Sequence, residues 1–409
     1  MTKIDELIQE LCPDGVETFP LEECCNILDK KRKPVTKNSR EKGEYPYYGA
    51  NGVQDYVSDY IFNGKFVLVG EDGSVITKSG TPVVTWAEGK IWVNNHAHVI
   101  EEKSGTMLRY LYFYIQTIDV TSLIHGNIPK LTGRDFRSLK IALPPLEIQR
   151  EIVSILDNFT NLTAELTAEL TARKTQYGYY RDKLLEVETD IHKYTLGEIA
   201  TVTKLAGFEF TNYVTYSERG NIIALRGLNV KNGKLDLSDV KYIDKSDFSK
   251  LERSKLHIGD MLFTYVGTVG QVAIVDEEDK YYLAPNVALI RFDKKILLPQ
   301  YMKYYFQTTQ FWDKQIRRLL QSSSMQNIPM EKIRKFEIIV PPFDVQNRIV
   351  NVLDNFEKIC SDLNIGLPAE IEARQKQYEY YRDKLLTFAE TGNTILSRAE
   401  QSRAEQSRA

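Results

Sequence analysis

Cysteine is scarce in this sequence, and none of it follows a metal-binding pattern. The chain has four cysteines among 409 residues, without a Cys-x-x-Cys spacing and without histidines placed to complete a zinc site. This predicts reduced thiols, which are typical of the cytoplasm. Residues 1–6 are too acidic and too little apolar for a signal peptide, so we expect a cytoplasmic location.

Long hydrophobic runs and a strong positive charge are also missing. No apolar run approaches the roughly 20 residues that span a bilayer, so we expect no membrane partner. The formal net charge is −3, from 53 basic and 56 acidic residues. Proteins that coat nucleic acid indiscriminately usually carry a strong positive excess, so the balance argues against that class. Local charge can still be basic, because seven cations between residues 30 and 42 face only Glu41.

The sequence does contain a duplication. Leu-Pro-Pro-Leu-Glu-Ile-Gln at 143–149, Ile-Leu-Asp-Asn-Phe at 155–159 and Tyr-Gly-Tyr-Tyr-Arg-Asp-Lys-Leu-Leu at 177–185 return in closely similar form at 340–346, 352–356 and 378–386. The regions before each copy are less alike, although Val16, Phe19 and Leu21 match Ile191, Tyr194 and Leu196. This pattern predicts two diverged domains, each followed by a similar spacer.

Each domain has the pattern of a mixed α+β fold. Short apolar runs at 66–70, 81–86, 91–93 and 97–100 predict strands, followed by a helical stretch at 107–118 and a closing run at 139–143. The second domain repeats this order at 222–225, 260–265, 287–290, 301–320 and 336–340. We divide the chain into a first domain (1–145), a first spacer (146–188), a second domain (189–342), a second spacer (343–390) and a low-complexity tail (391–409).

The spacers have helical periodicity. Apolar residues from Ile148 to Leu170 recur at steps of three or four, which predicts one helix over 147–187, roughly 60 Å long at 1.5 Å per residue. Its apolar stripe needs a partner, and the second spacer has a similar stripe interrupted at 364–368. We predict that the spacers pack as an antiparallel coiled coil. The alternative is that each helix covers only its own domain.

A smaller repeat, Thr-Ala-Glu-Leu, occurs at 163–166 and 167–170 in the first spacer. Each added copy would lengthen the helix by roughly 6 Å and rotate the rest of the chain by about 40°. The segment is therefore interpreted as an adjustable ruler. The alternative is an ordinary solvated helix with pairs such as Glu169 and Arg173.

Catalytic motifs match poorly. The proline pairs follow Leu143 and Val340, which lack the side-chain acceptor that amino-methylating enzymes place there. The glycines of 267–270 lack the pattern of a phosphate or cofactor loop, and 276–279 is interpreted as an exposed turn rather than half of a nuclease site. His96 and His98 form a conceivable metal pair, but a structural or base-contacting role is favoured without a third ligand. We expect a binding protein that is not itself an enzyme.

The duplicated Pro-Pro-Leu-Glu-Ile-Gln-Arg and Pro-Pro-Phe-Asp-Val-Gln-Asn segments resemble the specificity (S) subunit of Type I restriction-modification systems. Asn-Ile-Pro at 127–129 and 327–329, Gly-Asp-Met-Leu at 259–262 and the Thr-Ala-Glu-Leu repeats support the resemblance. It implies a non-catalytic bacterial subunit with two target recognition domains, each reading half of a split sequence in double-stranded DNA. It also implies two methyltransferase (M) subunits and restriction (R) subunits as partners. S-adenosylmethionine, ATP and Mg would be held by those partners, with no cofactor on this chain.

Base readout requires Arg, Lys, Asn and Gln side chains at groove edges, while other cations contact phosphates. Candidates in the first domain are Lys31, Arg32, Lys33, Lys37, Tyr47, Asn51, Lys78 and Asn127. Those in the second are Lys204, Arg226, Lys231, Lys234, Arg317, Arg318, Gln321 and Asn327. The alternative for each is ordinary solvated surface. For the whole chain, the alternatives are a coiled-coil scaffold without sequence-specific DNA binding and a self-sufficient nuclease or methylase.

Overall fold

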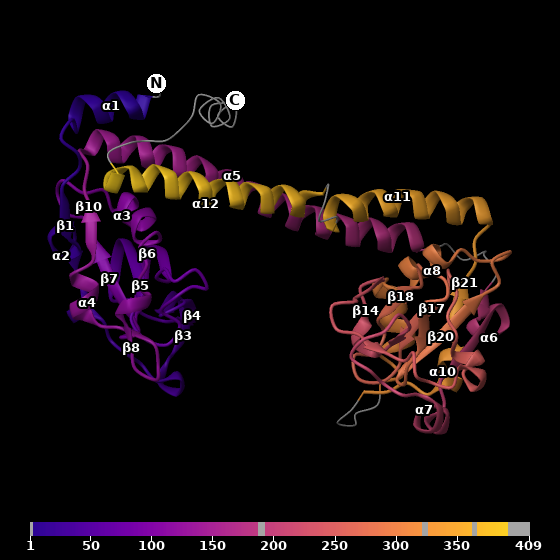
Figure 1. Ribbon diagram of the computed structural model, residues 1–409. Coiled ribbons are helices and arrows are strands. Elements are labelled where there is room, and N and C mark those ends of the chain that lie inside the picture. Colours follow the sequence, from indigo (N-terminus) through magenta and orange to yellow (C-terminus); the bar gives the residue numbers. More distant parts are fainter. Residues whose placement is uncertain (1–2, 187–192, 321–325, 362–365, 392–409) are drawn as a thin grey trace. The chain divides into compact units, whose positions relative to one another are not determined.

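The computed structural model describes residues 3–186, 193–320, 326–361 and 366–391 (Figure 1). It divides into two compact units. Unit 1 comprises Met1–Thr167 and Glu370–Ala409, and unit 2 comprises Ala168–Ala369. The mixed α+β fold predicted for both domains is confirmed. No helix among the described residues is long and apolar enough to cross a membrane.

Unit 1 is built on a six-stranded sheet with the order β2-β7-β5-β6-β3-β4. Its strands are β1 (Thr18–Pro20), β2 (Asn26–Ile27), β3 (Lys42–Gly49), β4 (Gly52–Val57), β5 (Phe62–Gly70), β6 (Val84–Val93), β7 (Ala97–Glu101), β8 (Ile124–His125), β9 (Lys130–Leu131) and β10 (Lys140–Ala142). Its short helices are α1 (Lys3–Leu11), α2 (Leu21–Cys24), α3 (Leu108–Ile115) and α4 (Gly133–Arg137). One face of the sheet packs on α3, whose aromatic and aliphatic side chains are mostly buried.

The sequence predicted separate strands at 81–86 and 91–93, which is wrong because β6 is continuous. It pairs with β5 from Val84 opposite Val69 to Ile91 opposite Phe62. Gly89 interrupts the apolar pattern, but it faces Gly64 across the ladder and has a φ of +87°, a conformation that favours glycine. Gly89 is therefore a local irregularity within one strand and not a strand end.

Unit 2 has a four-stranded sheet, β12-β20-β17-β18, beside a three-stranded sheet, β16-β13-β19. Its strands are β11 (Lys193–Thr195), β12 (Ala200–Lys204), β13 (Ile223–Leu225), β14 (Val230–Lys231), β15 (Lys234–Leu235), β16 (Lys241–Tyr242), β17 (Met261–Thr264), β18 (Val272–Ile274), β19 (Tyr281–Leu283), β20 (Val287–Phe292) and β21 (Glu337–Ile339). Its short helices are α6 (Leu196–Ile199), α7 (Gly207–Tyr213), α8 (Pro299–Phe306), α9 (Thr309–Phe311) and α10 (Met330–Arg334). The helix predicted at 301–320 is thus broken, since Thr308 caps the start of α9 with its side chain.

The spacer helices are α5 (Leu146–Leu185), α11 (Phe343–Ser361) and α12 (Leu367–Thr391). In unit 1 the first part of α5 packs on the last part of α12, where Phe159 stacks on Tyr381 with ring centroids 5.3 Å apart. In unit 2 the last part of α5 packs on α11, where Tyr180 lies 5.7 Å from Phe356. The antiparallel pairing is confirmed in both units (Figure 1). The alternative, that each spacer helix covers only its own domain, is therefore wrong for the second spacer. Tyr378 of its helix α12 contacts Phe113 of α3, which belongs to the first domain.

Each duplicated proline pair is followed by a buried glutamine that fixes the start of a spacer helix. Gln149 donates from Nε2 to the carbonyls of Pro144 (2.8 Å) and Gly105 (3.1 Å), and its Oε1 accepts from the Met107 N–H (2.8 Å). Gln346 makes the same three kinds of bond in unit 2. The duplicated motif is therefore a structural clamp between a spacer helix and the loop before α3 or α8.

The predicted divisions at 145, 188, 342 and 390 follow the duplication and stay a prediction. The compact units group the chain differently, because each contains part of α5. The Thr-Ala-Glu-Leu repeats lie inside α5, where Leu166 and Leu170 are half-buried. Arg173 also pairs with Glu169 at 3.3 Å, as the solvated-helix alternative expected.

Candidate nucleic-acid interface

Loops at one end of the unit 1 sheet enclose an open hollow of about 510 Å³, which we name hollow A. It lies after β5, before β7 and between β3 and β4, and residues 128–130 close it. Its lining residues are Ala50, Asn51, Gln54, Asp72, Gly73, Ser74, His96, Ile128 and Lys130. Amide, hydroxyl, carboxylate, imidazole and ammonium groups therefore surround one space. Ile128 adds an aliphatic side chain that is 69% exposed.

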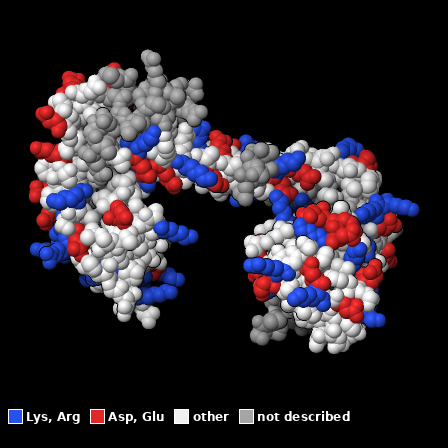
Figure 2. Space-filling model, in the orientation of Figure 1, with Lys and Arg blue, Asp and Glu red and all other residues white. Residues whose placement is uncertain are grey.

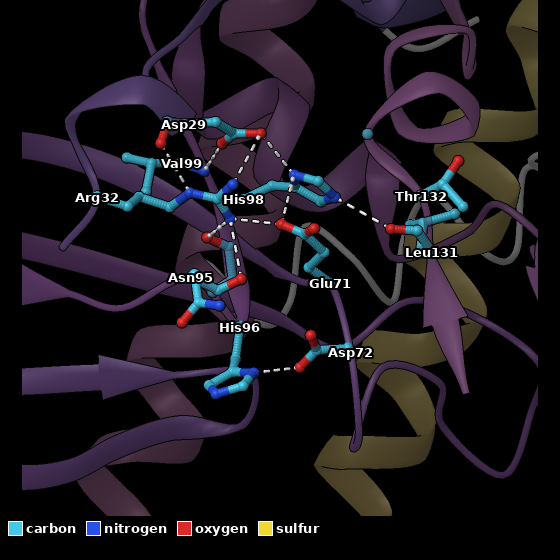
Figure 3. A network of polar contacts seen from close by, with 12 residues as sticks. Asp29, Arg32, Glu71, Asp72, Asn95, His96, His98, Val99, Leu131 and Thr132 are labelled. Atoms are coloured by element: carbon cyan, nitrogen blue, oxygen red, sulfur yellow. Dashed lines mark hydrogen bonds and ion pairs between the residues drawn. The ribbon is translucent and has the colours of Figure 1, made fainter. Parts of the chain in front are cut away.

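A mostly buried ion network holds the walls of hollow A (Figure 3). The Arg32 guanidinium donates to Glu71 (2.6 Å) and to the Ala97 carbonyl (2.7 Å). His98 donates to Asp29 (2.7 Å) and to the Leu131 carbonyl (3.2 Å), and it stacks on Phe136. These bonds connect the loop after β5, the start of β7 and β9. The network therefore fixes the backbone that carries Asp72, His96 and Lys130.

Three residues of the same network are of types that can ligate a metal ion. Oxygen and nitrogen atoms of Asp29, Glu71 and His98 lie within 4.8 Å of one another, which is close enough to hold an ion. However, Arg32 already bonds Glu71, and it lies 3.6 Å from Asp29. Burial raises the pKa of Asp29, but the hydrogen bond from His98, the His98 charge, the Val99 N–H and Arg32 together lower it below its usual value. Arg32 and His98 thus place positive charge beside the two carboxylates.

His96 and His98 therefore have different roles, although both were considered for a metal pair. His98 is fully buried in the network, whereas the His96 side chain is 48% exposed and bonds Asp72 through Nδ1 (Figure 3). The His96 N–H also donates to the Asn94 side chain at 2.8 Å. His96 and Asp72 thus form a polar pair on the wall of hollow A.

Unit 2 has a comparable hollow of about 480 Å³, which we name hollow B. Its lining residues are Phe210, Tyr216, Arg226, Gly227, Leu228, Val266, Thr268, Pro285 and Asn286. Arg226 donates to the backbone and side-chain oxygens of Asp239, each at 2.9 Å. Its Nε is buried and has no hydrogen-bond partner among the described residues. Hollow B therefore presents an arginine beside aromatic and aliphatic groups.

The unit 1 candidates divide into inward and outward side chains. Arg32 belongs to the buried network, and Tyr47 is buried with its hydroxyl bonded to Val35, so a base contact from either would require breaking these bonds. Lys31, Lys33, Lys37, Asn51, Lys78 and Asn127 are exposed. Asn51 lines hollow A. Lys33 lies over the Trp92 ring, 5.9 Å from its centroid.

The unit 2 candidates are mostly exposed, and several are paired. Lys231 contacts Asp236 (2.6 Å), Lys234 contacts Glu357 (3.4 Å) and Arg317 contacts Asp313 (3.1 Å). Lys204, Arg318 and Asn327 are exposed, Arg226 lines hollow B, and Gln321 lies outside the described residues. On the face shown in Figure 2, basic and acidic side chains are interspersed on both units. DNA contact by any of these residues stays a prediction.

The candidates predicted from the sequence include an asparagine from each Asn-Ile-Pro triplet, Asn127 and Asn327, but not Lys130. Gly73 N–H donates to the Pro129 carbonyl, and the equivalent Gly267 N–H donates to that of Gln326, three residues before Pro329. Leu131 and Ile328 likewise donate to the carbonyls of Glu71 and Tyr265. The triplets are therefore not structural equivalents, and the counterpart of Asn327 is Lys130. Asp72, Gln54 and Asn286 were also missed, since their loops carry no motif.

The rejected catalytic motifs have structural explanations. The Pro144 and Pro341 carbonyls accept from the two clamp glutamines. Glu278 bonds His257 and the Ile258 N–H, as expected of an exposed turn. The four cysteines are free and buried. Burial raises the pKa of Cys24 to about 11 and that of Cys25 to about 12, so both thiols are unreactive at neutral pH.

The sequence was compared with known families and proteins. The family described as type I restriction modification DNA specificity domain matches residues 13–173 and 188–373. A putative type I restriction enzyme specificity subunit of Haemophilus influenzae is 36% identical over 385 residues, covering 91% of this chain and 96% of that protein. A type I restriction enzyme specificity subunit of Escherichia coli is 34% identical over 302 residues, covering 70% of this chain and 72% of that one.

Solved structures support the same fold. The S subunit of a type I restriction-modification system from M. genitalium superimposes with a TM-score of 0.53 at 13% identity, covering 90% of this chain and 96% of that one. A chain from a structure describing assembly of a type I R-M system superimposes with a TM-score of 0.58 at 14% identity, covering 91% and 98%. With both repeats matched by the family and a relative aligned over nearly its whole length, this chain belongs to the type I restriction-modification DNA specificity family.

Proposed function

We propose that this chain reads a split sequence in double-stranded DNA, with each unit recognising one half-site. The observation that carries the proposal is the pair of hollows in the two family-matched repeats, because their linings differ. Hollow A contains Asp72, His96 and Lys130, whereas hollow B contains Arg226, Thr268 and Asn286. These side-chain types recognise base edges in a groove. Two dissimilar linings would recognise two dissimilar half-sites.

Exposed cations outside the hollows would hold the phosphates. Lys31, Lys33 and Lys37 lie between β2 and β3 of unit 1 and have exposed side chains. Phosphate contacts orient a protein on the duplex without carrying sequence information, and their strength falls with salt. The net charge of −3 fits a protein with such local contacts better than one that coats DNA.

The chain would direct enzymes rather than act as one. We propose that it binds two methyltransferase subunits and the restriction subunits of a type I complex, as the family membership supports. S-adenosylmethionine, ATP and Mg would then be bound by those partners, which would carry out methylation, translocation and cleavage. The role of this chain would be to place them on the recognised sequence.

The helix α5 would fix the separation of the half-sites. Its 40 residues correspond to roughly 60 Å at 1.5 Å per residue. Within each unit, aromatic packing of α5 against α12 or α11 supports a stiff connection. The Thr-Ala-Glu-Leu repeats inside α5 would then act as the adjustable part of this ruler.

Methylation mapping tests the proposal. Co-expression with a cognate methyltransferase subunit in a host lacking this system should methylate a sequence made of two defined halves around an undefined gap. The purified chain alone should neither methylate nor cleave DNA. One uninterrupted methylated sequence would contradict recognition of a split site. DNA binding without sequence preference would favour the scaffold alternative instead.

A further inference from the structure

The two hollows occupy the same place in the two repeats. The Glu71 N–H donates to the His96 carbonyl, as the Tyr265 N–H does to that of Asn286. In the strand ladders, Gly70 lies opposite Ala97 and Thr264 opposite Val287. These registers make positions 72 and 266 equivalent, and likewise positions 96 and 286.

A third pair of positions is defined by the chain that closes each hollow. Lys130 forms a β-bridge with Asp72, and Asn327 forms the equivalent bridge with Val266. Lys130 lines hollow A, and Asn327 adjoins hollow B through its bridge partner. The three position pairs are therefore 72 with 266, 96 with 286, and 130 with 327.

The backbone at these positions is shared, whereas the side chains are not. In unit 1 the three positions hold Asp72, His96 and Lys130, which are all ionisable. In unit 2 they hold Val266, Asn286 and Asn327, which are all uncharged. The supporting residues change as well. Asp29 of the unit 1 network corresponds through the β2 and β12 registers to Lys204, which lies over Tyr265.

Each hollow also combines polar groups with one exposed aliphatic side chain. Ile128 is 69% exposed in hollow A, and Leu228 is 41% exposed in hollow B. Base edges in the major groove offer this combination, since each base pair presents its own set of donors and acceptors and thymine adds a methyl group. The aliphatic groups and the Asp72 carboxylate would not bind phosphate, so they are not expected on a surface that contacts phosphates alone.

We propose that these three position pairs determine which bases each unit reads, in hollow A for one half-site and in hollow B for the other. This inference rests on the function proposed above. Arg32 has a different role. It is a positioning residue, because its bonds to Glu71 and to the Asn95 and Ala97 carbonyls fix the loops that carry Asp72 and His96.

Reciprocal exchange at the third pair tests the inference in the complete complex with the methyltransferase subunit. Lys130→Asn gives unit 1 the side chain that unit 2 has at the equivalent position, and Asn327→Lys gives unit 2 the side chain of unit 1. A base contact discriminates by about 1–3 kcal/mol, which corresponds to about 5- to 150-fold. Lys130→Asn should therefore change methylation by this factor at one or more base pairs of one half-site only. Asn327→Lys should change the other half-site only.

Lys65→Asn is the matched control. Lys65 is an exposed lysine on β5 of the same unit. It pairs with Glu88 at 3.6 Å, much as Lys130 pairs with Glu71 at 3.4 Å, but it lines neither hollow. Its replacement should leave both half-sites unchanged. The unaltered half-site in each exchange variant also reports that the chain is folded and assembled. If Lys130→Asn abolishes all methylation, His96→Asn replaces it as the test in hollow A.

Three results can be told apart. If the exchange variants methylate the wild-type sequence without altered preference, the inference is overturned while the proposed function stands. If Lys130→Asn weakens binding to all sequences equally and reduces its salt dependence, Lys130 contacts phosphate, and the inference is again overturned. If the wild-type complex methylates no split sequence, the proposed function fails, and the inference fails with it.

Discussion

Replacing Gln149 by alanine should destabilise unit 1 strongly, because its buried amide closes three hydrogen bonds at the start of α5. The change would leave the Met107 N–H and the Pro144 and Gly105 carbonyls without their partner. A buried group that loses its partner costs about 1–3 kcal/mol. Some relaxation or entry of water is expected, so we predict a loss of about 3–5 kcal/mol in the free energy of unfolding. For a unit of this size, that corresponds to roughly 6–20 °C in Tm.

The assay is urea-induced unfolding of the full chain, combined with hydrogen exchange to assign the loss to a unit. Gln346→Ala should produce a similar loss in unit 2, since Gln346 makes the same bonds there. Gln300→Ala is the control, because Gln300 is exposed on α8 and its loss should cost within about 0.5 kcal/mol. If Gln149→Ala were no more destabilising than this control, the clamp interpretation would be refuted.

Three further predictions concern charge, length and pH. Replacing Lys31, Lys33 and Lys37 together by glutamine should weaken DNA binding at low salt and reduce the slope of log affinity against log salt by up to about 3. Affinity measured at several salt concentrations gives this slope. An unchanged slope would exclude phosphate contacts by these residues. Inserting one Thr-Ala-Glu-Leu unit after 167–170 should widen the gap in the methylated sequence by roughly 6 Å, about two base pairs, and an altered half-site would contradict the ruler. The pKa of Asp29 is lowered in the folded chain, so ionised Asp29 stabilises the fold above the usual aspartate pKa of about 3.9, and this stabilisation is lost as pH falls through the lower folded value. Asp29→Asn should therefore reduce the acid sensitivity of the free energy of unfolding, measured between about pH 5 and pH 2. An identical pH profile for the variant would count against the network.

Much of the fold could be predicted because its signals are local. Apolar residues from Ile148 to Leu170 recur at helical spacing, which is enough to predict α5. The duplicated segments predict α11 and α12 as its partners. The sequence also predicts that the second spacer resumes as a helix after an interruption at 364–368, and α12 begins at Leu367, while residues 362–365 lie outside the described part of the chain. The continuity of β6 could not be predicted, because Gly89 adopts its conformation opposite Gly64 on a strand that is distant in sequence.

The candidate site was harder to predict because residue type does not reveal side-chain direction. Arg32 and Lys31 are adjacent and both basic, yet Arg32 turns inward to Glu71 while Lys31 is exposed. Asp72 carried no signal at all, since its loop contains no motif. The two Asn-Ile-Pro triplets are not structural equivalents, because the backbone register pairs Asn327 with Lys130, and only the structure reveals that register.

The grouping of residues 370–409 with the first unit has a consequence for synthesis on the ribosome. The partner segments of unit 2 are contiguous, so all of them have been translated once residue 369 has been added. Unit 1 cannot gain its last helix until the segment containing Tyr381 and Leu385 has left the exit tunnel. The half of the protein that is made first is therefore the half that is finished last. Until then, Phe159 of the nascent chain lacks the Tyr381 ring that stacks on it.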